Sequence, residues 1–189
     1  MYDRAYWEQL WAKTLRDHPD KVASRQPNAT MIAELAELTP ARVLDAGCGH
    51  GGEALWLGAR GWKVTAVDYS PDALSHGRQT AEAMGIADSI QWICGDLATW
   101  NAPAASFDLV VCLYVHCAGG AAEMIQRLAN TVAPGGTLFM IGHRQAGDQI
   151  QISVEDATAA LAGWEFVVAE ERPRASTGTE AVIRAKRIA

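Results

Sequence analysis

The sequence lacks an apolar run of the roughly 20 residues that a helix needs to cross a bilayer. It also lacks a cluster of Lys and Arg that would follow a phosphate backbone, and its formal net charge is −6. Both features argue against a nucleic-acid partner and against a membrane partner. The first residues, MYDRAYWEQLWAKTLRDHPDK, are polar and acidic, unlike a secretory signal peptide. We therefore expect a cytoplasmic protein.

Cysteine is scarce, and no hydrolase signature of the form G-x-S-x-G is present. Because nothing indicates export, the few cysteines are expected to be reduced and buried thiols rather than a disulfide framework. The spacing of Cys112 and Cys117, with His116 and His143, matches no zinc pattern. We therefore expect no metal site. The four cysteines are Cys48, Cys94, Cys112 and Cys117.

The length of 189 residues fits a single domain with a hydrophobic core, residues 1–189. Short β-branched runs alternate with helical runs, which is typical of βαβ units in an α/β fold. We predict a Rossmann-like, seven-stranded, mostly parallel sheet with helices on both faces. The predicted strands are Arg42–Asp45, Lys63–Val67, Ile90–Ile93, Phe107–Leu113, Thr137–Ile141, Glu165–Ala169 and Ala181–Lys186.

Helices are predicted between these strands and ahead of the first one. Ser70 and Ser153 are candidate N-caps, and Pro71 suits the first helical position. Trp7 and Trp11 are spaced i, i+4 and so share a helix face. They either fasten this helix to the domain or form an aromatic flap over a ligand, and the two roles are compatible. The predicted helices are Asp3–Asp17, Thr30–Leu38, Glu53–Arg60, Pro71–Met84, Ala121–Val132 and Ser153–Ala162.

The stretch VLDAGCGHGG at 43–52 combines a strand end with a glycine-rich loop. Gly47, Gly49 and Gly52 satisfy the pattern G-x-G-x-x-G of dinucleotide sites. Asp45, however, would face the pyrophosphate of a dinucleotide, at a cost on the order of 1–4 kcal/mol. S-adenosylmethionine has no phosphate and carries an ammonium and a sulfonium, so an acid near the loop favours it. Asp68, at the end of the next strand, is placed to accept from ribose hydroxyls in either case.

Five blocks occur in an order that resembles the class I S-adenosylmethionine-dependent methyltransferases over about residues 30–189: VLDAGCGHGG, VTAVDYSPDAL, CGDL, FDLVVCLYVHC and LANTVAPGGTLFMI. The resemblance implies S-adenosylmethionine as cofactor and S-adenosylhomocysteine as product. The segment YWEQLWA…RQPN resembles a small-molecule subgroup that includes tellurite-resistance and thiopurine or thiol methyltransferases. By that resemblance residues 1–40 form a helical lid and 41–189 the cofactor-binding core.

The resemblance also implies roles for single residues. The loop backbone near Asp45 holds the methionine end, Asp68 the ribose, Tyr69 and Asp96 the adenine, and Leu113 lines the far side of the cofactor. Arg25 is expected to pair with the methionine carboxylate. The residues expected to bind the cofactor are Arg25, Asp45, Gly47, Cys48, Gly49, Asp68, Tyr69, Gly95, Asp96, Leu97 and Leu113.

Each of the polar residues also has a structural alternative. Asp45 can tie loop N–H groups, Asp68 can cap the next helix, and Asp96 can be a turn residue. Arg25 can equally be a solvated surface arginine. For Asp45, the structural role is compatible with ligand binding.

The expected reaction is an in-line displacement at the sulfonium methyl by a small-molecule acceptor. A thiolate needs no base, whereas a hydroxyl is helped by one. The candidates are His116, His143 and Tyr114, which follow predicted strands, and the alternative for each is a residue that only shapes the pocket. An RNA or protein methyltransferase, a nicotinamide-dependent oxidoreductase and a non-enzymatic cofactor-binding protein are the competing functions; Asp45 argues against the oxidoreductase.

Overall fold

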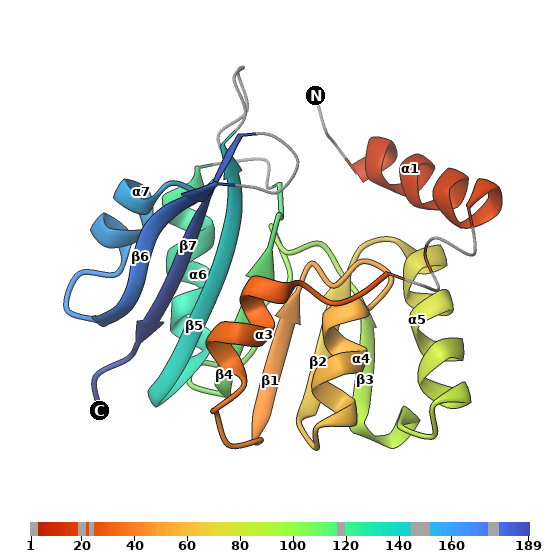
Figure 1. Ribbon diagram of the computed structural model, residues 1–189, viewed down its shortest axis with the longest axis horizontal. Coiled ribbons are helices and arrows are strands. Elements are labelled where there is room, and N and C mark those ends of the chain that lie inside the picture. Colours follow the sequence, from red (N-terminus) through yellow and green to blue (C-terminus); the bar gives the residue numbers. More distant parts are fainter. Residues whose placement is uncertain (1–3, 19–21, 23–24, 117–119, 145–151, 174–177) are drawn as a thin grey trace. The chain divides into compact units, whose positions relative to one another are not determined.

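The computed structural model describes residues 4–18, 22, 25–116, 120–144, 152–173 and 178–189 (Figure 1). The chain divides into two compact units, Met1–Trp100 and Asn101–Ala189. Its seven strands follow the order β3-β2-β1-β4-β5-β7-β6 in one sheet. The predicted α/β fold with a seven-stranded, mostly parallel sheet is confirmed. Among the described residues, no helix is long and apolar enough to cross a membrane.

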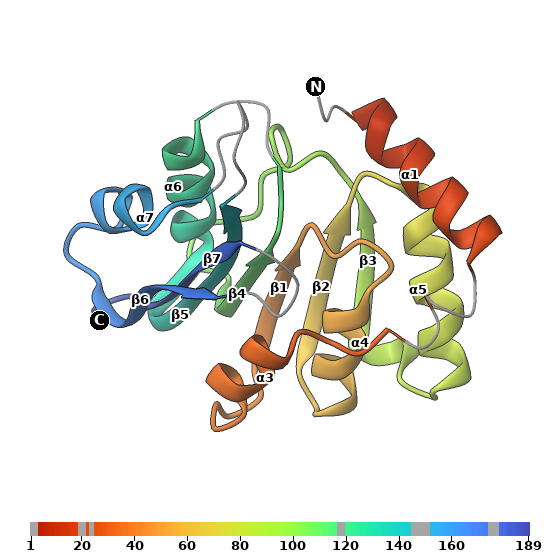
Figure 2. The same ribbon diagram turned by 45° about the horizontal axis from the view of Figure 1, so that its top comes forward.

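The first unit contains three parallel strands, because β1 pairs with β2 and β2 with β3. Their inner residues, such as Val43, Leu44 and Ala66, are completely buried. Helix α1 packs against α5, as Figures 1 and 2 show. The elements are α1 (Arg4–Asp17), α3 (Ala29–Leu35), β1 (Arg42–Ala46), α4 (Gly52–Ala59), β2 (Lys63–Asp68), α5 (Pro71–Ala83), the 3-10 helix η1 (Ala87–Ser89) and β3 (Ile90–Cys94).

The second unit contains the antiparallel part of the sheet. Strand β4 is parallel to β5, whereas β7 is antiparallel to both β5 and β6. Helix α6 packs against β4, β5 and α7. The elements are β4 (Phe107–Leu113), α6 (Ala121–Thr131), β5 (Val132–Arg144), α7 (Val154–Ala160), β6 (Glu165–Pro173) and β7 (Thr179–Lys186).

The local signals for helix starts are confirmed. The Ser70 hydroxyl accepts from the backbone N–H of Ala73 at 3.3 Å, and Pro71 occupies the first turn of α5. The Ser153 hydroxyl accepts from the N–H of Asp156 at 3.0 Å at the start of α7. These caps satisfy donors that the first helical turn leaves open.

Two predictions, the start of one strand and the burial of one cysteine, are wrong. Strand β5 begins at Val132 rather than at Thr137, because the Pro-Gly-Gly segment forms an irregularity inside the strand and not a turn ahead of it. There, the N–H of Gly135 donates to the carbonyl of Arg187 at 2.9 Å. Cys94 is exposed, because it ends the outermost strand β3, whereas Cys48 and Cys112 are buried as predicted. Cys117 lies outside the described residues.

One tryptophan organises the packing of β3 against the neighbouring helices. The indole of Trp92 lies between Gly51, ahead of α4, and Gly77, within α5, so that a Cβ at either glycine would overlap its ring. Gly51 also has φ +87°, a conformation that L side chains rarely adopt. The two glycines therefore allow a large side chain to fill the space beside the glycine-rich loop.

We expect Gly51→Ala to lower the free energy of unfolding by about 3 kcal/mol, because it adds overpacking to left-handed backbone strain. The control is Gly85→Ala, at φ +70° with no atom within 4 Å of the added Cβ. It should lose about 1 kcal/mol, from strain alone. Urea unfolding measures both variants. Equal losses would show that the contact with Trp92 does not matter.

Candidate active site

The glycine-rich loop is closed by hydrogen bonds to the end of β2. The N–H groups of Gly47 and Cys48 donate to the carbonyl of Val67 at 2.8 and 3.1 Å. The N–H of Gly49 donates to Oδ2 of Asp68 at 2.9 Å. Gly47 and Gly49 both have positive φ, so the tight turn depends on glycine at these positions. The loop therefore has one defined conformation before any ligand binds.

Both carboxylate oxygens of Asp68 accept hydrogen bonds from backbone N–H groups. Besides Gly49, the N–H of Ser70 donates to Oδ1 at 2.9 Å. The side chain is 9% exposed, and burial raises its pKa while these backbone hydrogen bonds oppose the rise. The helix cap that was the alternative role for Asp68 is provided by Ser70 instead, and Asp68 holds the N–H groups of two loops, the role predicted as an alternative for Asp45. Each carboxylate oxygen has a second acceptor position, so a hydroxyl donor from a ligand can still be accommodated.

Asp45 is the acid with an open oxygen. Its side chain is 2% exposed, and its Oδ2 has no hydrogen-bond partner among the described residues. Burial raises its pKa well above the ordinary value, and the charges of Glu53 and Asp68 add to the rise. The N–H of Ala54 partly offsets this. Because a buried, unpartnered carboxylate oxygen is costly, it fits a site that receives a cationic group.

Cys48 contributes to this loop through its backbone rather than its thiol. The thiol is buried, and its Sγ lies 3.7 Å from the carbonyl oxygen of Gly49. Burial, followed by the charges of Asp45 and Asp68, raises its pKa well above the ordinary value. A thiol held in its protonated form is a poor nucleophile.

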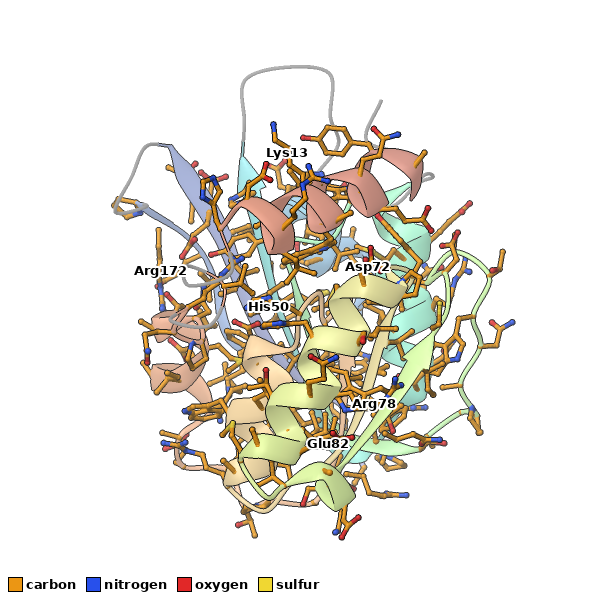
Figure 3. The ribbon with its side chains drawn as sticks, turned by 90° about the vertical axis from the view of Figure 1, so that its right-hand side faces the viewer. Lys13, His50, Asp72, Arg78, Glu82 and Arg172 are labelled. Atoms are coloured by element: carbon orange, nitrogen blue, oxygen red, sulfur yellow. The ribbon has the colours of Figure 1, made fainter. Side chains whose placement is uncertain are left out.

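An aromatic side chain from α1 covers the loop. A Cβ at Gly49 would lie 2.6 Å from Cζ2 of Trp11, so the indole rests directly on this glycine. The ring of Trp11 also lies 5.3 Å from that of His50, centroid to centroid. Figure 3 shows His50 beneath α1 and beside α5. Trp11 therefore fastens α1 to the loop, whereas Trp7 makes an edge contact with Tyr6 within α1.

His50 was not predicted as a site residue, although it lies inside the glycine motif. It is 6% exposed, and burial lowers its pKa to about 4, with smaller effects from the charges of Arg25 and His76. Its imidazole is therefore neutral at pH 7. Nothing local in the sequence signals this burial, because it comes from the contact with Trp11.

The segment between α1 and α3 is joined to the loop region through Asn28. Its side chain caps α3 by accepting from the N–H of Met31 at 2.9 Å, and its own N–H donates to Glu53 at 3.0 Å. Arg25 is exposed, yet its charge acts on His50. Glu53 thus contributes both to this connection and to the negative charge around Asp45.

A second loop, after β3, lies next to the Asp68 end of β2. The N–H of Gly95 donates to the carbonyl of Asp68 at 3.0 Å. The Asp96 carboxylate accepts from the N–H of Ala98 at 2.8 Å, so it acts as a turn residue here. Leu97 is buried, and Tyr69 is half-buried. The first unit therefore gathers the predicted residues of both loops around the end of β2.

The second unit holds a separate polar cluster that we call the tyrosine cluster: Tyr114, His143 and Glu180. The Tyr114 hydroxyl donates to Oε2 of Glu180 at 2.9 Å, and its ring stacks on His143 at 4.2 Å. Leu113 ends β4 just before it. His116 is half-buried, and burial lowers its pKa. The structure brings Tyr114 and His143 together and adds Glu180, which sequence reasoning missed.

The described residues contain no group of three or more His, Cys, Asp or Glu side chains arranged to hold a metal ion. Within the described ranges, no salt bridge joins Asp45, Glu53 or Asp68 to a basic side chain. Such a site suits an organic cation that also forms hydrogen bonds.

Comparison with known proteins agrees with this geometry. The family described as "Methyltransferase domain" matches residues 43–136. Probable thiol methyltransferase 2 of Arabidopsis thaliana is 26% identical over 162 residues, covering 82% of this chain and 70% of that protein. The tRNA 5-carboxymethoxyuridine methyltransferase of Escherichia coli K12 is 32% identical over 117 residues, covering 60% of this chain and only 45% of that protein.

Solved structures share the fold at low identity. TehB from Haemophilus influenzae has a TM-score of 0.76 at 17% identity, covering 89% of this chain and 65% of that one. The N-methyltransferase NodS from Bradyrhizobium japonicum WM9, in complex with S-adenosyl-l-homocysteine, has a TM-score of 0.75 at 18% identity, covering 96% and 98%.

The chain belongs to the class I S-adenosylmethionine-dependent methyltransferases, and its cofactor is S-adenosylmethionine. Within that class, the chain is similar in sequence to the thiol methyltransferase, and it shares its fold with TehB.

The depressed pKa of His50 predicts a pH-dependent stability. Because the folded-state pKa of about 4 lies below the unfolded value of 6.5, its contribution is present above pH 6.5 and is lost as the pH falls toward 4. We expect His50 to account for about 3 kcal/mol of the loss between pH 7 and pH 4. Urea unfolding at both pH values should show this part missing in His50→Gln. The exposed His18→Gln should lose as much stability as the wild type, and an identical loss in His50→Gln would contradict a buried neutral imidazole.

Proposed function

We propose that the protein transfers the methyl group of S-adenosylmethionine to a small-molecule acceptor by in-line displacement. The observation that carries this proposal is the open, buried oxygen of Asp45 beside two further carboxylates, Glu53 and Asp68. The ammonium of the cofactor's methionine end supplies the missing positive charge and hydrogen-bond donor. The name of the thiol methyltransferase supports a small acceptor.

The loop after β1 would hold the methionine end. Its backbone at Gly47, Cys48 and Gly49 allows close approach, and Asp45 binds the ammonium. The guanidinium of Arg25, which is exposed, is free to turn toward the methionine carboxylate as a charge-assisted pair. Together these groups recognise both charges of an amino acid.

The loops after β2 and β3 would hold the nucleoside. Asp68 accepts from the ribose hydroxyls with the acceptor positions that Gly49 and Ser70 leave open. Tyr69 packs beside the adenine. The segment at Gly95, Asp96 and Leu97 closes the other side, with the second Asp96 oxygen accepting from the adenine amino group.

The α1 helix would cover the bound cofactor. Trp11 already rests on Gly49, so a ligand bound at the loop would lie beside the indole. An aromatic cover excludes water from the reacting sulfonium. Trp11 would then have both predicted roles, as part of an aromatic flap over the ligand and as the contact that packs α1 on the domain.

The acceptor side would be formed by Leu113, Tyr114, His116 and His143. The sulfonium supplies an activated methyl group, so these residues need to position the acceptor in line and to take its proton where it has one. His116 and His143 carry imidazoles suited to that transfer. An acceptor that reacts as a thiolate needs only the positioning.

An RNA acceptor is the second candidate, because a ribosomal RNA methyltransferase is 30% identical to this chain and a transfer RNA methyltransferase is 32% identical. The chain spans only 45% of the length of each. Its net charge of −6 does not suit a polyanion. We therefore favour the small-molecule acceptor.

We expect Asp45→Asn to weaken S-adenosylmethionine binding about 10- to 100-fold, because the ammonium loses a charged acceptor. The same change should stabilise the cofactor-free protein at pH 7. The raised folded-state pKa of Asp45 means that its stabilising contribution is present below its unfolded pKa and is lost as the pH rises. Calorimetric titration and thermal unfolding measure the two effects. The exposed Asp88→Asn serves as control, and unaltered binding in Asp45→Asn would contradict the assignment.

The acceptor class is tested by release of S-adenosylhomocysteine. The protein is incubated with S-adenosylmethionine and a panel of thiols, phenols, amines and heterocycles, with bulk transfer RNA as the competing acceptor. Turnover is expected with at least one small compound and not with RNA. Turnover with RNA alone would replace the small-molecule proposal by the RNA one.

A further inference from the structure

The carboxyl group of Asp45 is buried with one of its two oxygens unsatisfied. The side chain is 2% exposed, and Oδ2 has no hydrogen-bond partner among the described residues. A hydrogen bond from the N–H of Ala54, in the first turn of α4, favours the charged form. A negative charge is nevertheless costly to bury where one oxygen contacts neither water nor a donor, so the neutral acid suits this place better than the carboxylate does.

Two further acids lie near Asp45, and both accept hydrogen bonds from the backbone. Both oxygens of Asp68 accept from N–H groups at 2.9 Å, and Glu53 accepts from the N–H of Asn28 at 3.0 Å. Hydrogen bonds from N–H groups stabilise a carboxylate relative to the neutral acid. Asp45, whose second oxygen has no such donor, is therefore the acid of the three that is best suited to hold a proton.

The charges around Asp45 act in the same direction as its burial. Across the described part of the chain, the titratable groups that interact with it are Glu53 from α4, Asp68 from β2 and the thiol of Cys48 from the loop between them. Burial is the largest effect on the pKa of Asp45, and the two carboxylates raise this pKa further. The pKa of the Cys48 thiol is also raised, so this thiol supplies no positive charge that would oppose them.

We propose that the cofactor-free protein holds a proton on the carboxyl group of Asp45, and that this proton leaves when the ammonium of S-adenosylmethionine binds. This inference rests on the proposed function, which places the ammonium at Asp45. In the step, the O–H bond of the carboxylic acid breaks, its electron pair stays on the oxygen, and the proton passes to the buffer. The ammonium keeps its own protons and donates a hydrogen bond to the carboxylate.

This coupling determines how cofactor affinity depends on pH. The bound ammonium lowers the pKa of Asp45, because an opposite charge favours the carboxylate. At pH values between the pKa of the bound protein and that of the cofactor-free protein, binding releases up to one proton. In this window the affinity falls by up to about 10-fold for each unit by which the pH falls. Above the window Asp45 is already charged, and binding releases no proton from it.

The test counts the protons that are released when S-adenosylhomocysteine binds, because this compound keeps the ammonium of the cofactor. Calorimetric titrations are run at several pH values, each in two buffers with different ionisation enthalpies. The difference between the two measured enthalpies gives the number of protons released. We expect a maximum of about one proton and a decline to zero at high pH. 5′-Methylthioadenosine, which has the nucleoside but no ammonium, should bind without proton release.

Two conservative variants identify the residue that carries the proton. Asp45→Asn keeps the shape of the side chain but has no acidic proton, so S-adenosylhomocysteine should bind more weakly and release none. Glu53→Gln keeps an oxygen that can accept from the N–H of Asn28 but removes a negative charge that acts on Asp45. Its window of proton release should shift to lower pH. The control is Glu82→Gln, an exposed residue of α5, with wild-type release at every pH.

The outcomes separate this inference from the proposed function. Binding of S-adenosylhomocysteine without proton release at any pH would overturn the proton on Asp45 and leave the methyltransferase function standing. Undiminished proton release in Asp45→Asn, or equal release with 5′-methylthioadenosine, would also overturn it. If the wild type does not bind S-adenosylhomocysteine at all, the proposed function itself is wrong.

A second readout uses the cofactor-free protein alone. The infrared difference spectrum between the wild type and Asp45→Asn is recorded at about pH 6, above the ordinary range of carboxyl pKa values. It should contain the C=O stretching band of a carboxylic acid, and this band should disappear at high pH. If Asp45→Asn does not fold, Glu53→Gln takes its place, and its band should disappear at a lower pH than that of the wild type. A wild-type spectrum without such a band would overturn the inference.

Discussion

The carboxylate of Asp68 is the group on which the conformation of the proposed cofactor site depends. It joins the loops after β1 and β2 by accepting from the N–H groups of Gly49 and Ser70. Because these hydrogen bonds fix the glycine-rich loop without help from Asp45, that second acid remains buried with an open oxygen. The loop is thus rigid and still lacks one positive partner. The unfavourable burial of such a carboxylate is typical of a site where a bound ligand supplies the missing positive charge and hydrogen-bond donor.

The same loop determines how α1 is held. Trp11 approaches Gly49 so closely that any side chain there would displace it, and its ring lies on His50, which burial keeps neutral. A protonated His50 would place a cation beneath the indole and beside the charge of Arg25. Gly49, which the proposed function places against the cofactor, is therefore also the residue whose missing side chain lets α1 pack on the loop.

The sequence predicted the elements well because their signals are local. Apolar periodicity located the strands, and hydroxyl caps such as Ser70 located helix starts. The roles of the two acids were predicted less well. Both were expected beside the ligand, yet Asp68 also accepts hydrogen bonds from the backbone N–H groups of Gly49 and Ser70. Trp92, His50 and Glu180 were not recognised as important. Each has its role through contacts with residues distant in the sequence. Glu180, for example, accepts a hydrogen bond from Tyr114, 66 positions away, and no local sequence pattern predicts such a contact.

The proposed cofactor residues and the proposed acceptor residues therefore differ in how well the sequence predicts them. The proposed cofactor residues follow three consecutive strands, β1, β2 and β3, and the spacing of the motifs points to them. The proposed acceptor residues include Tyr114, whose φ is positive, and its hydrogen-bond partner Glu180 lies on β7, which is antiparallel and follows a long stretch without motifs. Relatives with this fold are named for thiols, transfer RNA and N-methylation. Because a shared fold does not specify the acceptor, the proposed function assigns the choice of acceptor to residues outside the glycine motif. Acceptor identity should accordingly be sought in Tyr114, His143 and Glu180 rather than in the glycine motif.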